Sequence, residues 1–262
     1  MSHHLTTQIA ANGVATLTLN NAERHNAFDD HLIAGLIAAL EELNAATNVR
    51  VVVLAAAGKS FSAGADLGWM KRMASYSEAE NLADAKLLAR LMHTLNTLGK
   101  PVVAAVQGPA YGGGVGLVAC CDMVFAAPEA LFALTEVKLG LIPAVISPYV
   151  ISKIGASHAR RYFVSAERFD AATAQRIGLV HEIVPRDEVL TMAHSWAAQL
   201  LNNGPESMAS AKRLVAEVAN RPICEDLNHH CASRIAVQRV SAEGQEGLTA
   251  FLEKRPASWI KH

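Results

Sequence analysis

The sequence predicts an α/β protein built on a parallel sheet, followed by an all-helical region. Residues 51–55 (VVVLA) and 102–106 (VVAAV) are unbroken apolar runs, a pattern typical of strands that are covered on both faces. Strand, loop and helix sequence repeat along the chain, which favours parallel pairing of the strands. Helix-forming sequence dominates after about residue 200, through residues 206–219 and 224–241, which indicates a helical C-terminal subdomain.

The composition indicates a globular protein with a substantial core, since 51% of its 262 residues are hydrophobic and 18% are charged. A formal net charge of -1 gives no general field that would attract nucleic acid or an anionic membrane, so we expect neither as a partner. No apolar run approaches the length that spans a bilayer. Four cysteines, together with a polar segment at residues 1–12, lead us to expect a reducing, cytoplasmic location.

The first half of the chain alternates strand and helix patterns. Residues 14–19 (VATLTL) alternate apolar residues with threonine, which predicts a half-buried strand. Asp30 precedes apolar residues at helical spacing, which predicts a helix over residues 31–46. Ser77 and Glu80 have the spacing of a capping box, and the following helix is expected to end near residue 98, before Pro101. Further elements are expected as a helix at 117–121, a strand at 123–126, and helices at 158–165, 171–177, 188–201, 206–219 and 224–241.

Residues 107–122 (QGPAYGGGVGLVACCD) contain three consecutive glycines, Gly112, Gly113 and Gly114, between a strand pattern and a helix pattern. Backbone amides at such a helix start can bind negative charge. Glycines also mark turns and tight packing, so the triplet alone leaves both interpretations open. A second glycine-containing loop, residues 58–70 (GKSFSAGADLGWM), also leads into a helix, and the two loops are candidate partners.

Three segments together resemble the crotonase, or enoyl-CoA hydratase/isomerase, superfamily: SFSAGAD at 60–66, QGPAYGGGVGLVACCD at 107–122, and FALTEVKLGLIP at 132–143. The resemblance covers nearly the whole chain. It implies a spiral of β-β-α turns, with residues 1–200 as the core that holds CoA and the active site. Residues 201–262 would form a helical trimerisation subdomain of a homotrimer or homohexamer. The implied substrate is an acyl-CoA thioester, with coenzyme A as part of the substrate and no prosthetic group.

The resemblance also implies catalytic residues. The backbone N–H groups of Ala65 and Gly113 would form an oxyanion hole for the enolate that arises from the thioester. Glu136 would act as the acid/base, because a carboxyl group among apolar neighbours has a raised pKa that suits proton transfer. From local sequence alone, a surface Glu136 paired with Lys138 is the simpler interpretation, and the motif reverses that preference.

Coenzyme A contacts are implied for six residues. The adenine would lie against the loop with Ala63, and basic groups would hold the phosphates; Asp66 is also expected to cap or order the oxyanion loop. The implied set is Arg24, Ala63, Ala65, Asp66, Lys71 and Lys254, with Lys254 acting from its own chain or from a neighbouring subunit. We expect no metal site, because the spacing of Cys224, His229, His230 and Cys231 matches no zinc signature.

Two departures from the family pattern limit what the resemblance implies. Many hydratases have a second glutamate in a GGGxE pattern, and this chain has Gly116 there. Either Glu136 acts alone or another group positions the water, with Tyr111, Ser147 and Tyr149 as weak candidates. Residues 144–150 (AVISPYV) replace the usual glycine-rich run.

The combined motifs look most like bacterial hydratases that act on 3-methylglutaconyl-CoA or isohexenylglutaconyl-CoA in leucine and terpenoid breakdown. Both substrates carry a distal carboxylate, for which Lys138 and Lys153 are candidate cations. A double-bond isomerase that uses Glu136 alone, and a non-catalytic CoA- or RNA-binding protein, stand as alternatives.

Overall fold

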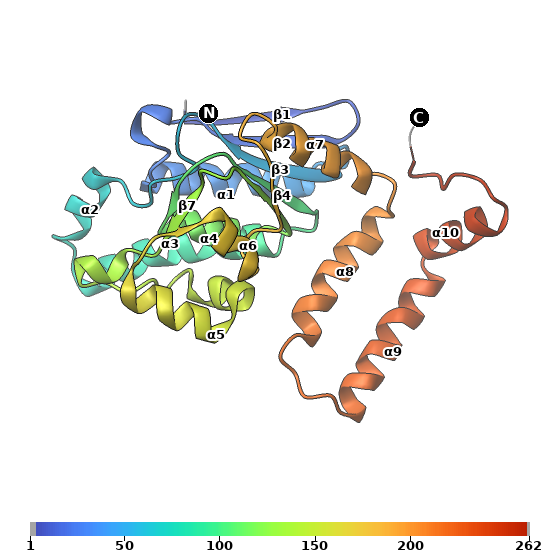
Figure 1. Ribbon diagram of the computed structural model, residues 1–262. Coiled ribbons are helices and arrows are strands. Elements are labelled where there is room, and N and C mark those ends of the chain that lie inside the picture. Colours follow the sequence, from blue (N-terminus) through green and yellow to red (C-terminus); the bar gives the residue numbers. More distant parts are fainter. Residues whose placement is uncertain (1–3, 261–262) are drawn as a thin grey trace.

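The computed structural model describes residues 4–260, and within them the chain forms two sheets wrapped by helices (Figure 1). In the six-stranded sheet, β1 pairs antiparallel with β2 and every later neighbour is parallel. The predicted parallel pairing is confirmed. The strands lie in the order β1 (Leu5–Ile9), β2 (Val14–Leu19), β3 (Val51–Ala56), β4 (Val102–Val106), β6 (Met123–Ala126) and β9 (Glu182–Ile183).

The smaller sheet positions the candidate site. In it β5 (Ala110–Tyr111) pairs in parallel with β7 (Leu131–Ala133), which pairs antiparallel with β8 (Phe169–Asp170). An isolated bridge between Ser62 and Ala110 adds the loop before α2 (Leu67–Met73) to the other edge of this sheet. The segments that follow Ser62, β5 and β7 come from distant parts of the sequence, and they leave the same end of this sheet side by side.

Helices cover both faces of the large sheet. The apolar side chains of α1 (Asp30–Ala45), α3 (Glu78–Asn96), α4 (Gly113–Cys120) and α5 (Ser147–Ser165) share one buried cluster. On the opposite face α7 (Val189–Leu200) packs against a second cluster with β3, β4 and β6. This double cover explains why the parallel strands are apolar without alternation.

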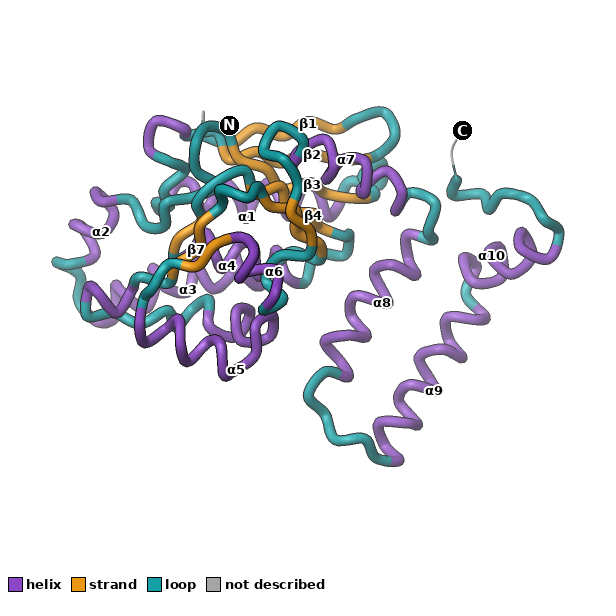
Figure 2. Tube along the Cα trace, in the orientation of Figure 1, coloured by secondary structure: helices purple, strands orange, loops and turns teal. Residues whose placement is uncertain are grey.

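The last three helices lie apart from these layers (Figure 2). They are α8 (Pro205–Val218), α9 (Glu225–Val240) and α10 (Ala242–Leu252). Within the described chain α8 buries no residue, and large apolar side chains such as Val240 and Phe251 are 77% and 82% exposed. The division of the chain near residue 200, and the assembly state that would cover these helices, stay predictions. Over residues 4–260 no helix is both long enough and apolar enough to span a membrane.

Several elements differ from the sequence prediction. The capping box between Ser77 and Glu80 is confirmed at the start of α3. The edge strand β1 was not expected, because its sequence LTTQI is polar and it is mostly exposed. The strands β8 and β9 were not expected either, since two-residue strands are too short to show periodicity, whereas α6 (Ala171–Arg176) lies within the expected helix at 171–177. Helix α4 begins at Gly113, four residues before the expected start, so tertiary packing outweighs the low helix propensity of glycine.

Candidate active site

Gly112 joins the small sheet to α4 and adopts a conformation that favours glycine. It is the N-cap of α4 with φ 49° and ψ -118°, and its N–H donates to Ala133 O of β7 at 2.9 Å. A methyl group at this position would lie 3.2 Å from Glu136 Oε1 and 4.0 Å from Gly64 Cα. Three separate segments therefore meet at Gly112: α4, the turn with Glu136, and the loop before α2.

Gly113 supplies the first free amide of the site. It is the first residue of α4, so its N–H has no acceptor within the helix, and no other described residue accepts from it. A methyl group here would lie 3.1 Å from the Phe28 ring, which brings the ring close to the helix start. An N–H group at the positive end of a helix dipole favours a negatively charged ligand.

Ala65 supplies the second free amide of the site. Phe28 N–H donates to Gly64 O and Asp66 N–H donates to Phe28 O, both at 2.7 Å, which forms a parallel bridge around Ala65. In this geometry the N–H of Ala65 points away from Phe28, and it finds no acceptor in the described chain. A methyl group at Gly64 would lie 3.2 Å from Tyr111 O, so the loop with Ala65 touches the chain that leads into α4.

Glu136 lies beside the start of α4 and carries an unpartnered carboxylate oxygen. It begins the short 3₁₀ helix η2 (Glu136–Leu139), and within residues 4–260 its buried Oε2 atom makes no hydrogen bond. Burial raises the pKa of this carboxyl group above its ordinary value, because the charged form loses solvation. No ion pair joins Glu136 to the exposed Lys138. The local-sequence interpretation, a pair with Lys138, is therefore wrong, and the acid/base role of Glu136 stays a prediction.

Gly116 lies one turn further along α4, and its surroundings exclude a larger residue. A methyl group at this position would overlap Ile146 Cγ2 and lie 3.1 Å from Met92 Cε. Ile146 is buried and immediately precedes α5. The two departures from the family pattern are thus one feature, because Ile146, from the segment AVISPYV, fills the space beside Gly116.

Asp66 is the N-cap of α2, as expected. Its Oδ1 accepts from Gly68 N at 2.8 Å and Trp69 N at 3.1 Å, and Oδ2 pairs with Arg24 at 3.3 Å. Desolvation would raise the pKa of this carboxyl group, but the two amides and the guanidinium outweigh it and lower the pKa. Asp66 is therefore held as an anion that orders the start of α2.

The structure groups most of the residues implied for coenzyme A. Ala63 N–H donates to His25 O at 2.9 Å, which links the loop of Ala63, Ala65 and Asp66 to the turn that carries Arg24. Lys71 lies on α2, directly after that loop, and its side chain is exposed. Lys254 follows α10, and α10 lies on the opposite side of Figure 1 from α2, so the structure does not bring Lys254 to this loop within one chain. These coenzyme A contacts stay predictions.

The remaining candidates differ in their environments. Ser147 Oγ donates to Ala144 O at 2.8 Å, and burial raises the pKa of Tyr149. The Arg168 guanidinium lies over the Tyr111 ring. Within residues 4–260 no group of histidine, cysteine or acidic side chains has the arrangement of a metal site. The sequence reasoning missed Phe28 and Ile146, because an apolar residue near a site gives no signal before its neighbours are known.

Comparison with known proteins agrees with the fold. The family model described as enoyl-CoA hydratase/isomerase matches residues 10–262. A protein of Thermus thermophilus provisionally named as an enoyl-CoA hydratase is 36% identical over 95% of this chain and 98% of its own. The 2,3-dehydroadipyl-CoA hydratase of Escherichia coli is 32% identical over 92% of this chain and 93% of its own. The crystal structure of an enoyl-CoA hydratase from Shewanella pealeana is 45% identical, covers 98% and 96% of the two chains, and superposes with a TM-score of 0.95.

The chain therefore belongs to the enoyl-CoA hydratase/isomerase family and has the crotonase fold. It is an enzyme of the enoyl-CoA hydratase type, a lyase, in a family that also includes isomerases.

Proposed function

We propose that this enzyme adds water to the double bond of a branched glutaconyl-CoA, such as 3-methylglutaconyl-CoA, through an oxyanion-stabilised enolate. The observation that supports the proposal most is the buried, unpartnered Oε2 atom of Glu136 beside two chain segments with free N–H groups. An acid/base and two aimed donors are what proton transfer next to a thioester carbonyl requires.

The chemistry follows from these groups. Water adds its oxygen to the β-carbon, the π electrons of the double bond move toward the thioester oxygen, and the α-carbon takes up a proton. The N–H groups of Ala65 and Gly113 stabilise the negative oxygen, and one such donor contributes about 2.7–4 kcal/mol in other enzymes. Glu136 takes a proton from water and returns it to the α-carbon, for which a raised pKa is suitable.

The choice of substrate rests on the segment 144–150 and on the motifs that resemble the glutaconyl-CoA hydratases. The name of the Escherichia coli relative denotes an acyl chain that also ends in a second carboxylate. Family membership speaks against a non-catalytic CoA- or RNA-binding role, because the relatives are named as hydratases.

A double-bond isomerase is the second candidate. Ile146 lies so close to Gly116 that a second carboxylate does not fit there, and a single carboxylate suffices to move a proton between two carbons. In this reaction Glu136 would remove a proton at one carbon of the acyl chain and return it at another, with the enolate held by the same N–H groups.

A panel of enoyl-CoA thioesters with and without a branch and a distal carboxylate separates the two candidates. Products are identified by chromatography and mass spectrometry, since hydration adds the mass of water and isomerisation does not change mass. We expect water uptake to be fastest with 3-methylglutaconyl-CoA. Bond migration without hydration across the panel would exclude the hydratase proposal.

The proposal includes a homotrimer or homohexamer in the cytoplasm that needs no prosthetic group. The exposed apolar side chains of α8 to α10 support an assembly, because surface of this kind is normally covered in oligomers. Light scattering coupled to size-exclusion chromatography tests the assembly, and a monomer over a range of concentrations would contradict it.

A further inference from the structure

We propose that Arg168 binds the distal carboxylate of the acyl group and thereby selects substrates that carry one. The inference rests on the proposed function and goes beyond it by naming the residue that would distinguish a carboxylated acyl chain from an uncharged chain of the same branching. It replaces Lys138 and Lys153, the two cations that the sequence suggested.

The register of the small sheet places Arg168 beside the site. Tyr111 pairs with Ala133, and on the next strand Phe132 lies opposite Phe169 and Leu131 opposite Asp170. One step further along this antiparallel register, Arg168 lies opposite Ala133. Side chains in one row across a sheet point to the same face, so Tyr111, Ala133 and Arg168 share a face.

The small side chain of Ala133 lets the long arginine cross it. Neighbouring strands are about 4.8 Å apart, so Arg168 starts two strand spacings from Tyr111. Its Cζ atom nevertheless lies 5.6 Å from the centre of the Tyr111 ring, which shows that the side chain extends back over β7. Ala133 beneath it is fully buried, as expected for a residue that is covered in this way.

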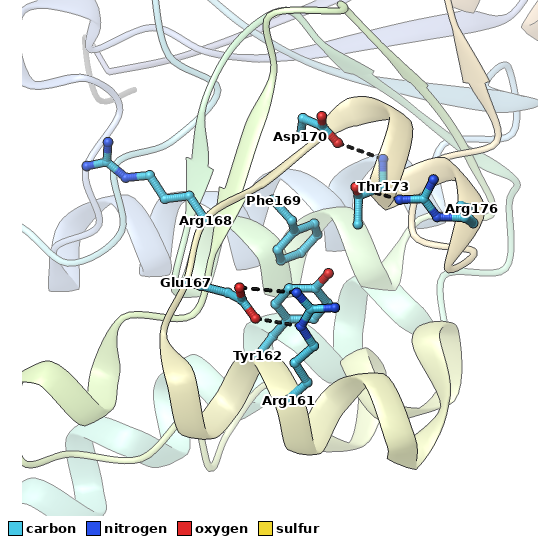
Figure 3. Close-up of a pocket in the computed structure, with 8 residues that line it drawn as sticks. All are labelled: Arg161, Tyr162, Glu167, Arg168, Phe169, Asp170, Thr173 and Arg176. Atoms are coloured by element: carbon cyan, nitrogen blue, oxygen red, sulfur yellow. Dashed lines mark hydrogen bonds and ion pairs between the residues drawn. The ribbon is translucent and has the colours of Figure 1, made fainter.

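The guanidinium of Arg168 is free to bind an anion. Within the described residues it makes no hydrogen bond or ion pair, and it lies over the Tyr111 ring. Two neighbours differ: Arg161 pairs with Glu167 at 2.6 and 3.3 Å, and Arg176 donates to Thr173 Oγ1 at 2.9 Å. Figure 3 shows these arginines around one cavity, with Arg168 directed away from the Arg161–Glu167 pair.

Strand order aligns Arg168 with the reacting groups. From one edge of the small sheet to the other come the loop with Ser62, then β5, β7 and β8. Ala65 follows the Ser62 segment, Gly113 follows β5, and Glu136 follows β7. These residues lie beyond the carboxyl ends of the first three strands. Because β8 runs in the opposite direction, Arg168, which precedes β8, lies at this same end of the sheet. The guanidinium extends back from there over Tyr111, two residues before Gly113, so an acyl chain bound at the oxyanion hole passes close to it.

Lys138 and Lys153 lie in less suitable positions for binding the distal carboxylate. Lys153 Nζ donates to Cys121 O at 2.8 Å, at the opposite end of α4 from Gly113. Lys138 is exposed and lies two residues after Glu136 in a 3₁₀ helix, where such residues point to different sides. A stacked guanidinium is also the better partner, because it is held by the ring and offers two parallel N–H groups to a carboxylate.

The test compares two substrates that differ in the carboxylate: 3-methylglutaconyl-CoA and 3-methylcrotonyl-CoA. We expect Arg168→Met to lower kcat/KM for the first by about 10–100-fold, the range for losing a hydrogen bond to a charged group, and to change the second less than about threefold. Arg168→Lys keeps the positive charge but loses the two parallel N–H donors, and it is expected to retain part of the preference for 3-methylglutaconyl-CoA. Arg160→Met, an exposed arginine on α5, is the matched control and should leave both substrates unchanged.

Inhibition by glutaryl-CoA and butyryl-CoA separates failure of this inference from failure of the proposed function. If the wild-type enzyme hydrates neither test substrate but Arg168→Met weakens glutaryl-CoA selectively, Arg168 binds the carboxylate and the proposed reaction is wrong. If wild type prefers 3-methylglutaconyl-CoA and Arg168→Met lowers activity on both substrates equally, or on neither, the role assigned to Arg168 is wrong. Thermal melts of each variant show whether an equal loss reflects unfolding.

Discussion

Two carboxylates of the site region, Asp66 and Glu136, have opposite environments. Asp66 accepts two backbone N–H groups and pairs with Arg24, and these partners lower its pKa. Glu136 has a buried Oε2 atom without a partner in the described chain, and burial raises its pKa. The charged form of the same chemical group is therefore favoured at Asp66 and disfavoured at Glu136.

The difference lies in what surrounds each carboxyl group. Asp66 is adjacent to a helix start, where unpaired amides favour its charged form. Glu136 faces the backbone of Gly112, where no donor is directed at its Oε2 atom. A carboxyl group whose hydrogen bonds are all satisfied serves structure, whereas one left unsatisfied in a buried place is a candidate for chemistry.

Replacing Glu136 with Gln should have the largest effect. The amide keeps the shape of the side chain but moves no proton, so we expect kcat/KM to fall by about 10²–10⁴-fold, the usual contribution of general acid–base catalysis. Steady-state kinetics with the best substrate of the panel measure this loss. Unchanged turnover would show that Glu136 is not the acid/base, and Lys138→Gln is the exposed control.

Gly112→Ala should have the next largest effect on activity. Its methyl group would lie 3.2 Å from Glu136 Oε1, and the positive φ of 49° disfavours alanine, so both the carboxyl group and the start of α4 would shift. A displacement of about 1 Å at a reacting centre costs up to about 100-fold in rate. Gly140→Ala provides a control, because this glycine also has positive φ but no atom within 4 Å of the added methyl group. Equal activity loss in both variants would contradict the explanation by contact with Glu136.

Asp66→Ala should affect stability more than chemistry. Loss of the N-cap is expected to lower the free energy of unfolding by about 0.5–2 kcal/mol, while Asp66→Asn, which still caps, should cost much less. Chemical denaturation of the two variants measures the difference. A loss of kcat as large as that of Glu136→Gln, in folded protein, would break the distinction between the two carboxylates.

The smallest expected effect is a pH dependence of stability with opposite sign at the two sites. Asp66 has a lowered pKa, so its charged form stabilises the protein above its ordinary value of 3.8 and this contribution disappears as pH falls through the lowered pKa. Glu136 has a raised pKa, so it costs nothing below its ordinary value of 4.5; the cost grows as pH rises from 4.5 to the raised pKa and is constant above it.

Melting temperatures from about pH 2 to pH 8 test the opposite signs of the two pH dependences. We expect Glu136→Gln to melt above wild type at neutral pH and to converge with it under acid conditions, because the neutral amide avoids the burial of a charge. For Asp66→Asn the deficit should be largest at neutral pH and shrink in acid. A Glu136→Gln variant that melts below wild type at pH 7 would contradict a raised pKa at this position.

Much of the fold was predictable because it depends on local patterns. The apolar runs that became β3 and β4, the alternation in β2, and the capping box of α3 each follow from residues close in sequence. The start of α4 and the strand β1 were not predictable, since glycines have low helix propensity and LTTQI lacks an apolar face. Packing against the rest of the chain decides these elements.

The candidate site also has features that the local sequence predicts and features that only tertiary packing sets. The glycine triplet and the motif around Glu136 indicate an anion-stabilising helix start and an acid/base, because backbone amides and carboxyl groups carry these capacities wherever they occur. The free state of two N–H groups, the unpartnered Oε2 of Glu136 and the contact of Ile146 with Gly116 are properties of the folded chain.

The sequence by itself therefore determined the family and made Glu136 the candidate acid/base, because ordered motifs and the chemistry of single residues can be recognised without the fold. Tertiary structure decided which carboxylate is neutralised by partners, which position is closed by Ile146, and which arginine lies over Tyr111. Each of these depends on distances between residues far apart in the chain, and burial and hydrogen bonding are set only when those residues meet.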